Sequence, residues 1–155
     1  MRVGVVAIGR VKGPLAEAVA HYQARAARYW RLDVKEEREG KGGPPAVVKA
    51  EGAALLARVP ADGAMWALSR TGRSLSSPAF ARALEEISRR AHPIVTIVLG
   101  GAWGLSDDVL HEADQVMALG TMTLPHDLAR LVLFEQLYRA GSLLRGEPYH
   151  KGPPR

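Results

Sequence analysis

The alternation of strand-like and helix-like segments most constrains what this chain can fold into. Continuous apolar runs at residues 3–8, 64–68 and 93–99 are typical of strands that are covered on both faces. The remaining segments are two weaker strand patterns at 32–36 and 115–119, and helical patterns at 14–29, 46–58, 77–91 and 125–144. This order predicts an α/β fold in which helices flank a mostly parallel sheet of five or six strands.

Local signals mark the boundaries of these elements. Ser77 is expected to cap the helix at 77–91, and Ser106 is expected to cap a short helix whose first turn holds two aspartates. Residues 37–45 and 69–74 combine polar residues with helix and strand breakers, so we expect both to be loops.

Length and composition limit the class of protein. With 155 residues, the chain is expected to form a single domain over residues 1–155. Hydrophobic residues make up 47% and charged residues 24%, which excludes a wholly disordered chain. No apolar run approaches the roughly 18 residues that a membrane span needs, and residues 1–4 open a strand rather than a signal peptide. We therefore expect a cytoplasmic protein with no membrane segment.

Charge and missing residue types narrow the possible chemistry. The chain has no cysteine, which excludes disulfides, thiolate metal sites and a cysteine nucleophile. Its acidic residues and histidines show no metal-ligand spacing, so we expect no metal. The formal net charge of +5 is compatible with a polyanionic partner such as nucleic acid, although charge alone does not establish one.

Candidate ligand-binding residues follow three of the expected strands. Ligands of open α/β sheets bind beyond the carboxyl ends of the strands, which here are Leu68, Gly100 with Gly101, and residues 119–124. The glycines would let a backbone approach a ligand, but they match neither the dinucleotide fingerprint nor a P-loop, and they also suit ordinary tight turns. Residues 119–124 could read a purine edge through their backbone amides, or they could simply line the core.

The last helix carries further polar candidates. His126 and Arg130 are neighbours on one face of this helix, and so are Glu135 and Arg139. Glu135 continues an apolar stripe, so its carboxylate could face a seam between elements. The alternative is a plain Glu–Arg ion pair on the helix face, and His126 could be an ordinary polar residue at a helix start.

The C-terminal tail combines three useful side chains. Tyr149, His150 and Lys151 offer a stacking surface, a group that titrates near neutral pH and a cation. Such a set suits a nucleobase and its phosphate. The alternative is a frayed terminus without a function.

Five short motifs occur together in this chain. They read V-A-I-G at 6–9, I-V-L-G-G-A-W-G-L at 97–105, M-T-L-P-H at 122–126, F-E-Q-L-Y-R-A at 134–140 and P-Y-H-K at 148–151. In order and spacing they resemble the RlmH (YbeA) family of SPOUT-class methyltransferases. The resemblance implies methylation of N3 of a pseudouridine in bacterial 23S ribosomal RNA with S-adenosyl-L-methionine. It also implies a SPOUT fold with a C-terminal trefoil knot, and a homodimer whose active sites are shared between subunits.

The resemblance assigns roles by position. It places the cofactor against Leu68, Gly100, Leu119, Gly120, Thr121, Met122, Thr123 and Leu124. It makes residues 145–155 a tail that contacts the substrate, and the substrate-binding candidates are Arg130, Tyr138, Arg139 and Lys151. Because the N3 proton must leave, a base or a stabilised anion is needed, and the catalytic candidates are His150, Tyr149, His126 and Glu135. Ala102 and Trp103 depart from the family, whose members commonly have a more polar or acidic pair there.

Other functions fit the same sequence features. A SPOUT enzyme could act on another RNA such as tRNA, and a non-catalytic RNA-binding module could keep the same fold. A flavodoxin-like nucleotide binder would share the α/β pattern. The sequence also leaves open whether the substrate is free ribosomal RNA, the large subunit or an assembled ribosome.

Overall fold

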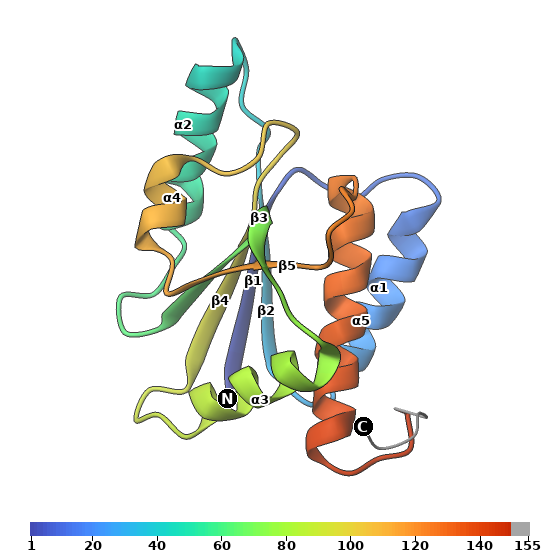
Figure 1. Ribbon diagram of the computed structural model, residues 1–155. Coiled ribbons are helices and arrows are strands. Elements are labelled where there is room, and N and C mark those ends of the chain that lie inside the picture. Colours follow the sequence, from blue (N-terminus) through green and yellow to red (C-terminus); the bar gives the residue numbers. More distant parts are fainter. Residues whose placement is uncertain (150–155) are drawn as a thin grey trace.

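The computed structural model describes residues 1–149, and its five strands form one parallel sheet in the order β2-β1-β4-β3-β5 (Figure 1). The strands are β1 (Arg2–Ile8), β2 (Arg31–Glu37), β3 (Ala64–Ser74), β4 (Ile94–Leu99) and β5 (Gln115–Ala118). The helices are α1 (Leu15–Ala26), α2 (Pro44–Leu56), α3 (Ser77–Ser88), α4 (Asp107–Glu112) and α5 (His126–Leu144). The predicted α/β fold around a parallel sheet is confirmed, with five strands. The trefoil knot stays a prediction.

Helices cover both faces of this sheet. On one face, α1, α3 and α5 pack over strand residues that include Val5 and Ile97. On the other face, α2 and α4 pack over strand residues that include Val6 and Val98. Side chains alternate between the two faces of a strand, so a strand buried on both faces reads as an unbroken apolar run.

The first strand lies inside the sheet, between β2 and β4. Arg2 of β1 pairs with Arg31 of β2 on one side and with Ile94 of β4 on the other. The N-terminal strand is therefore enclosed by segments that follow it much later in the chain.

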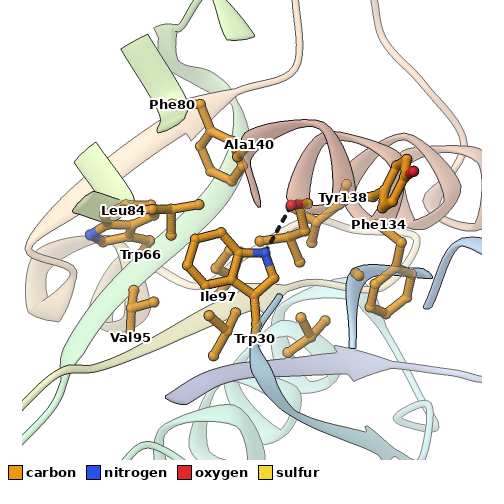
Figure 2. Packing of buried hydrophobic residues seen from close by; sticks show 14 of the residues in the cluster. Trp30, Trp66, Phe80, Leu84, Val95, Ile97, Phe134, Tyr138 and Ala140 are labelled. Atoms are coloured by element: carbon orange, nitrogen blue, oxygen red, sulfur yellow. Dashed lines mark hydrogen bonds between the residues drawn. The ribbon is translucent and has the colours of Figure 1, made fainter. Parts of the chain in front are cut away.

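The longest helix, α5, closes one side of the core. It packs against α1 and α3, and a β-carbon at Gly141 would overlap the ring of Tyr29. The indole of Trp30, which is 7% exposed, donates a hydrogen bond of 2.8 Å from Nε1 to the carbonyl oxygen of Leu137 in α5 (Figure 2). Within residues 1–149, neither α5 nor any other helix is both long enough and apolar enough to cross a membrane.

One predicted loop is part of a strand. Residues 69–74 extend β3, because Arg73 pairs with Met117 of β5 beyond a register shift that begins after Leu68. The backbones approach closely here, since a β-carbon at Gly72 would lie 2.5 Å from the carbonyl carbon of Met117. The loop prediction was therefore wrong: this polar segment is held by pairing with a distant strand.

The helix caps were predicted in part. Ser106 caps α4, and its Oγ accepts a hydrogen bond of 3.3 Å from the backbone N–H of Val109. The cap of α3 is Ser76 rather than Ser77, and the Ser77 hydroxyl instead donates a hydrogen bond of 2.6 Å to Gln136 of α5. Ser76 has the extended backbone that a capping residue needs, whereas Ser77 is already inside the helix.

We expect Trp30→Phe to lower the free energy of unfolding more than Trp66→Phe does. Both substitutions shrink a buried ring, but only Trp30 also loses its hydrogen bond to Leu137, which contributes about 1 kcal/mol net. Urea denaturation of the two variants measures the difference. Equal losses would show that Trp30 acts through packing alone.

Candidate functional site

A cavity of about 750 Å³ lies beyond the carboxyl ends of β3, β4 and β5. This edge of a parallel sheet is where ligands usually bind, and the volume falls in the range of small-molecule sites. Three segments build its walls: the part of β3 after Leu68, the glycine loop (residues 100–105) and the β5–α5 segment (residues 119–125). The lining residues are Leu68, Ser69, Arg70, Thr71, Leu99, Gly100, Gly101, Ala102, Trp103, Gly104, Leu105, Leu110, Ala118, Leu119, Gly120, Met122, Thr123, Leu124, Pro125, His126 and Ala129.

The glycine loop closes on itself. Gly101 and Gly104 form an isolated antiparallel bridge, in which the Gly104 N–H donates to the Gly101 carbonyl oxygen at 3.1 Å. Gly104 has a φ of +82°, a left-handed conformation that favours glycine. A β-carbon at Gly100 would lie 2.5 Å from the Gly104 carbonyl oxygen. Gly100 is therefore required by the loop itself, before any ligand is considered, and the bridge presents Ala102 and Trp103 at its tip.

The β5–α5 segment forms the facing wall. Of the residues expected to hold a cofactor here, the structure places Leu119, Gly120, Met122, Thr123 and Leu124 in the cavity lining. Thr121 does not line the cavity. The structure thus brings most of this predicted set together with Leu68 and Gly100, which come from two other strand ends.

Sequence reasoning missed residues 69–71 as part of this site. They line the cavity because β3 continues past Leu68 along the cavity wall. The expectation that ligands bind beyond the carboxyl ends of strands, the strand-end rule, was applied here to Leu68 alone. Applying it to the next three residues as well would have identified residues 69–71. The lining residues with a cationic or titratable side chain are Arg70 and His126, and within the described part of the chain none of the lining residues is acidic.

Arg130 anchors the start of α5 to the sheet. We expected it to contact a phosphate, but its side chain is enclosed and only 1% of the residue is exposed. Its Nη1 donates to Oε1 of Glu36 at 2.5 Å, and its Nη2 donates to the carbonyl oxygens of Gly9 at 2.9 Å and Ile8 at 3.3 Å. Burial lowers the pKa of this guanidinium, and the charge of Glu36 opposes that shift. Arg130 therefore positions α5 and the β5–α5 segment that precedes it.

A second group of predicted residues meets along the C-terminal half of α5. In this tail cluster, Oε1 of Glu135 accepts hydrogen bonds from Arg139 Nη2 at 2.5 Å and from the Tyr149 hydroxyl at 3.1 Å. The rings of Tyr138 and Tyr149 meet edge to face at 4.6 Å between centroids, and the guanidinium of Arg139 lies 4.8 Å from the Tyr149 ring centre. The plain Glu135–Arg139 ion pair does form, and the tail packs against it at Tyr149.

Tyr149 is held in its neutral form. Burial and hydrogen bonding raise the pKa of its hydroxyl to about 12, and Glu135 contributes through its negative charge. At neutral pH this hydroxyl is therefore a hydrogen-bond donor and not a base. His150 and Lys151, which complete the predicted tail constellation, lie outside the described residues.

The cavity and the tail cluster are far apart within one chain. His126 lines the cavity at the first residue of α5, and Tyr138 belongs to the tail cluster. A helical rise of 1.5 Å per residue separates these positions by about 18 Å. Figure 1 shows the same arrangement, with the end of the described chain at the opposite end of α5 from the β5–α5 segment. The nearest members of the two groups on α5 are Ala129 and Glu135, about 9 Å apart by the same rise.

Comparison with known proteins decides the family. The family model described as "Predicted SPOUT methyltransferase" matches residues 1–150. The chain belongs to the SPOUT methyltransferase family. The cavity at its strand ends is therefore the candidate site of a SPOUT protein, and the recognition made from the sequence motifs is confirmed.

Curated relatives place this SPOUT protein more closely. A protein of Gemmatimonas aurantiaca is 44% identical over 155 residues, covering 97% of this chain and 100% of the relative. A protein of Syntrophotalea carbinolica is 41% identical over 154 residues, covering 97% and 99%. A protein of Sorangium cellulosum is 47% identical over 150 residues, covering 96% and 99%. All three are named "Ribosomal RNA large subunit methyltransferase H".

A solved structure is similar at a lower level. The SpoU methyltransferase AviRb from Streptomyces viridochromogenes, determined in complex with AdoMet, aligns with 89% of this chain and 57% of its own at 12% identity and a TM-score of 0.45.

We expect Arg130→Met to lower the free energy of unfolding of this SPOUT protein by about 3 kcal/mol, because it leaves Glu36 and two strand-end carbonyl oxygens without their donor. The matched control is Arg139→Met on the same helix, whose pair with Glu135 is partly exposed and should cost no more than about 1 kcal/mol. Urea denaturation measures both, and limited proteolysis should cut the β5–α5 segment faster in Arg130→Met. Equal losses in the two variants would show that Arg130 is not a special anchor.

Proposed function

We propose that this SPOUT protein transfers a methyl group from S-adenosyl-L-methionine to large-subunit ribosomal RNA, at N3 of a pseudouridine in 23S RNA. The observation that carries the proposal is the cavity at the strand ends, where the glycine loop and the β5–α5 segment face one another in a chain of this family. The relatives named ribosomal RNA large subunit methyltransferase H support the substrate class. An enzyme that methylates bacterial ribosomal RNA would work in the cytoplasm.

The residues present fit S-adenosyl-L-methionine. The cavity of about 750 Å³ can hold a nucleoside with an amino acid attached, and its walls are mostly apolar side chains and glycine backbone. Leu68, Leu119 and Leu124 would enclose the cofactor, and the backbone amides of the β5–α5 segment would read its polar edges. When bound, this cofactor supplies an electrophilic methyl group on a positively charged sulfur.

For this reaction the protein must position N3 against the methyl group and remove one proton. The bound cofactor would supply the methyl group, and the protein would have to hold N3 in line with it and accept the N3 proton. Holding the two reacting atoms in line contributes several kcal/mol without any acid or base. Tyr149, with a pKa of about 12, is a neutral phenol at neutral pH, and Glu135 is engaged by Arg139 and Tyr149. We propose His150 as the first candidate for the proton acceptor, with His126 of the cavity lining as the second.

We also propose that the working form is a homodimer with shared sites. Tyr149 packs against Glu135, Tyr138 and Arg139 in the C-terminal half of α5, and none of these residues lines the cavity of the same chain. A second copy could bring its tail cluster, with Arg139 and Tyr149, to the cavity of the first. This arrangement would give residues 145–155 their role in contacting the substrate and leave Lys151 free to meet an RNA phosphate.

The decisive test of the activity is methyl transfer from labelled cofactor to 70S ribosomes, isolated large subunits and tRNA in parallel. We expect labelled 23S RNA, with the label on N3 of pseudouridine after nuclease digestion and mass spectrometry. Label in tRNA alone would overturn the substrate, and no label in any RNA would overturn the activity.

In this assay, Gly100→Ala should lose both cofactor affinity and methyl transfer. Its β-carbon collides with the Gly104 carbonyl oxygen at 2.5 Å, so the wall of the cavity has to move. The matched control is Gly43→Ala, whose added methyl meets nothing within 4 Å and which lies away from the cavity lining. Calorimetry with the cofactor measures affinity, and circular dichroism checks that both variants fold. Wild-type affinity in Gly100→Ala would remove the glycine loop from the site.

Shared sites predict that two inactive variants complement each other. Gly100→Ala disables the cavity, and deletion of residues 147–155 removes Tyr149 and the rest of the tail. Each should be inactive alone, but co-expressed chains should regain activity because one site of each mixed dimer combines an intact cavity with an intact tail. Light scattering should give a mass of twice 16.7 kDa. A fully active monomer, or mixed dimers without restored activity, would contradict the shared site.

A further inference from the structure

Trp103 is a large apolar side chain that the fold leaves in solvent. It is 61% exposed, whereas Trp30 and Trp66 are 7% and 3% exposed in the core. Exposing an indole forgoes the free energy that its burial would contribute, about 25 cal/mol per Å² of apolar surface. Nothing in the packing of the core accounts for a tryptophan at this position, which points to a contact outside the chain.

The loop that carries Trp103 is closed and short. The bridge between Gly101 and Gly104 leaves only Ala102 and Trp103 at the tip, and the φ of +82° at Gly104 sets the turn. Gly100 lies directly beneath, too close to the Gly104 carbonyl for any side chain. Trp103 is thus presented on a constrained turn, which lowers the entropy that it would lose on binding a ligand.

A second exposed apolar side chain lies on the facing wall of the same cavity. Met122 is 82% exposed and belongs to the β5–α5 segment. Among residues 1–149, the exposed large hydrophobic residues are Trp103, Met122 and, at 38%, Leu144, and the first two line the cavity. The exposed apolar surface is therefore gathered at the site and is not spread over the molecule.

The charges around this pair favour a flat ligand attached to an anion. Arg70 lines the same cavity, and within the described part of the chain no acidic residue does. A nucleobase needs an aromatic face for stacking and a cation for its phosphate, and Trp103 and Arg70 offer both at this cavity. The formal net charge of +5 over the whole chain also favours an anionic ligand.

We propose that Trp103 is a substrate-binding residue that stacks on an unpaired nucleobase of the RNA, with Met122 against the base edge and Arg70 near the phosphate. The proposal rests on the proposed function, because it takes the interior of the cavity for the cofactor and its exposed mouth for the RNA. In this proposal the backbone of the glycine loop faces the cofactor, and the side chain of Trp103 faces the RNA substrate.

Fluorescence tests the stacking directly, because Trp103 is the exposed member of the three tryptophans. Acrylamide should quench Trp103 in the free protein. A short single-stranded RNA should quench its emission and protect it from acrylamide, whereas abasic RNA of the same length should bind through its phosphates without these effects. Trp103→Phe should abolish the RNA-dependent signal, since the remaining indoles are buried.

Steady-state kinetics then distinguish a role of Trp103 in binding the RNA substrate from a role in binding the cofactor. Trp103→Ala should raise KM for the RNA substrate about 5- to 100-fold, the effect of losing one base–aromatic stack, while kcat and the calorimetric affinity for S-adenosyl-L-methionine change little. Trp103→Phe should restore most of the lost KM. The control is Leu144→Ala, an exposed apolar residue outside the cavity lining, which should leave KM unchanged.

Several results would overturn the proposal. Wild-type KM in Trp103→Ala, or equal quenching by abasic RNA, would show that no base stacks there. A loss of cofactor affinity that matches the loss of activity would assign Trp103 to the cofactor instead. Protection from acrylamide before RNA is added would mean that a second copy of the chain covers the indole. If the wild-type protein methylates no RNA, the proposed function fails, and the abasic comparison still decides whether Trp103 stacks.

Discussion

The buried contact between Arg130 and the ends of β1 and β2 determines where α5 begins, and the cavity depends on it. The guanidinium replaces its lost hydration with Glu36 and the carbonyl oxygens of Ile8 and Gly9. The β5–α5 segment directly precedes this anchor, so the facing wall of the cavity is placed by a side chain that does not itself line it. The glycine loop is held differently, by its own bridge between Gly101 and Gly104. One wall of the site is thus fixed through the core and the other by local backbone geometry.

The fold could be predicted well where burial controls the sequence pattern. The strands at 3–8 and 94–99 are apolar apart from Thr96, because helices cover both faces of the sheet. The extension of β3 to Ser74 could not be predicted, because its polar residues become a strand only by pairing with β5, more than 40 residues later. Ser76 and Ser77 are also indistinguishable by residue type, and the backbone conformation alone decides which one caps α3.

The cavity could be predicted from the sequence, but the position of the tail cluster could not. The cavity residues follow three strands that prove to be neighbours in the sheet, so the strand-end rule brings them to the same place. The rule contains nothing about α5. Glu135, Arg139 and Tyr149 do meet, but in the C-terminal half of that helix, and none of them lines the cavity. Helical spacing placed Arg130 beside His126 on one face of the helix, but it could not show that Arg130 binds the carbonyl groups at a strand end.

The position of β1 between β2 and β4 also affects how the chain folds during its synthesis. The ribosome releases β1 first, yet one of its two partners, β4, is synthesised much later. Arg2 of β1, for example, pairs with Ile94 of β4. The hydrogen bond between Trp30 and Leu137 closes a loop of 107 residues. Contacts of such long range form slowly, since their loop-closure entropy is lost before the contacts stabilise anything. The nascent chain must therefore carry an apolar strand with an unpaired edge through most of its synthesis, and the native core can close only after nearly the whole of α5 has left the ribosome.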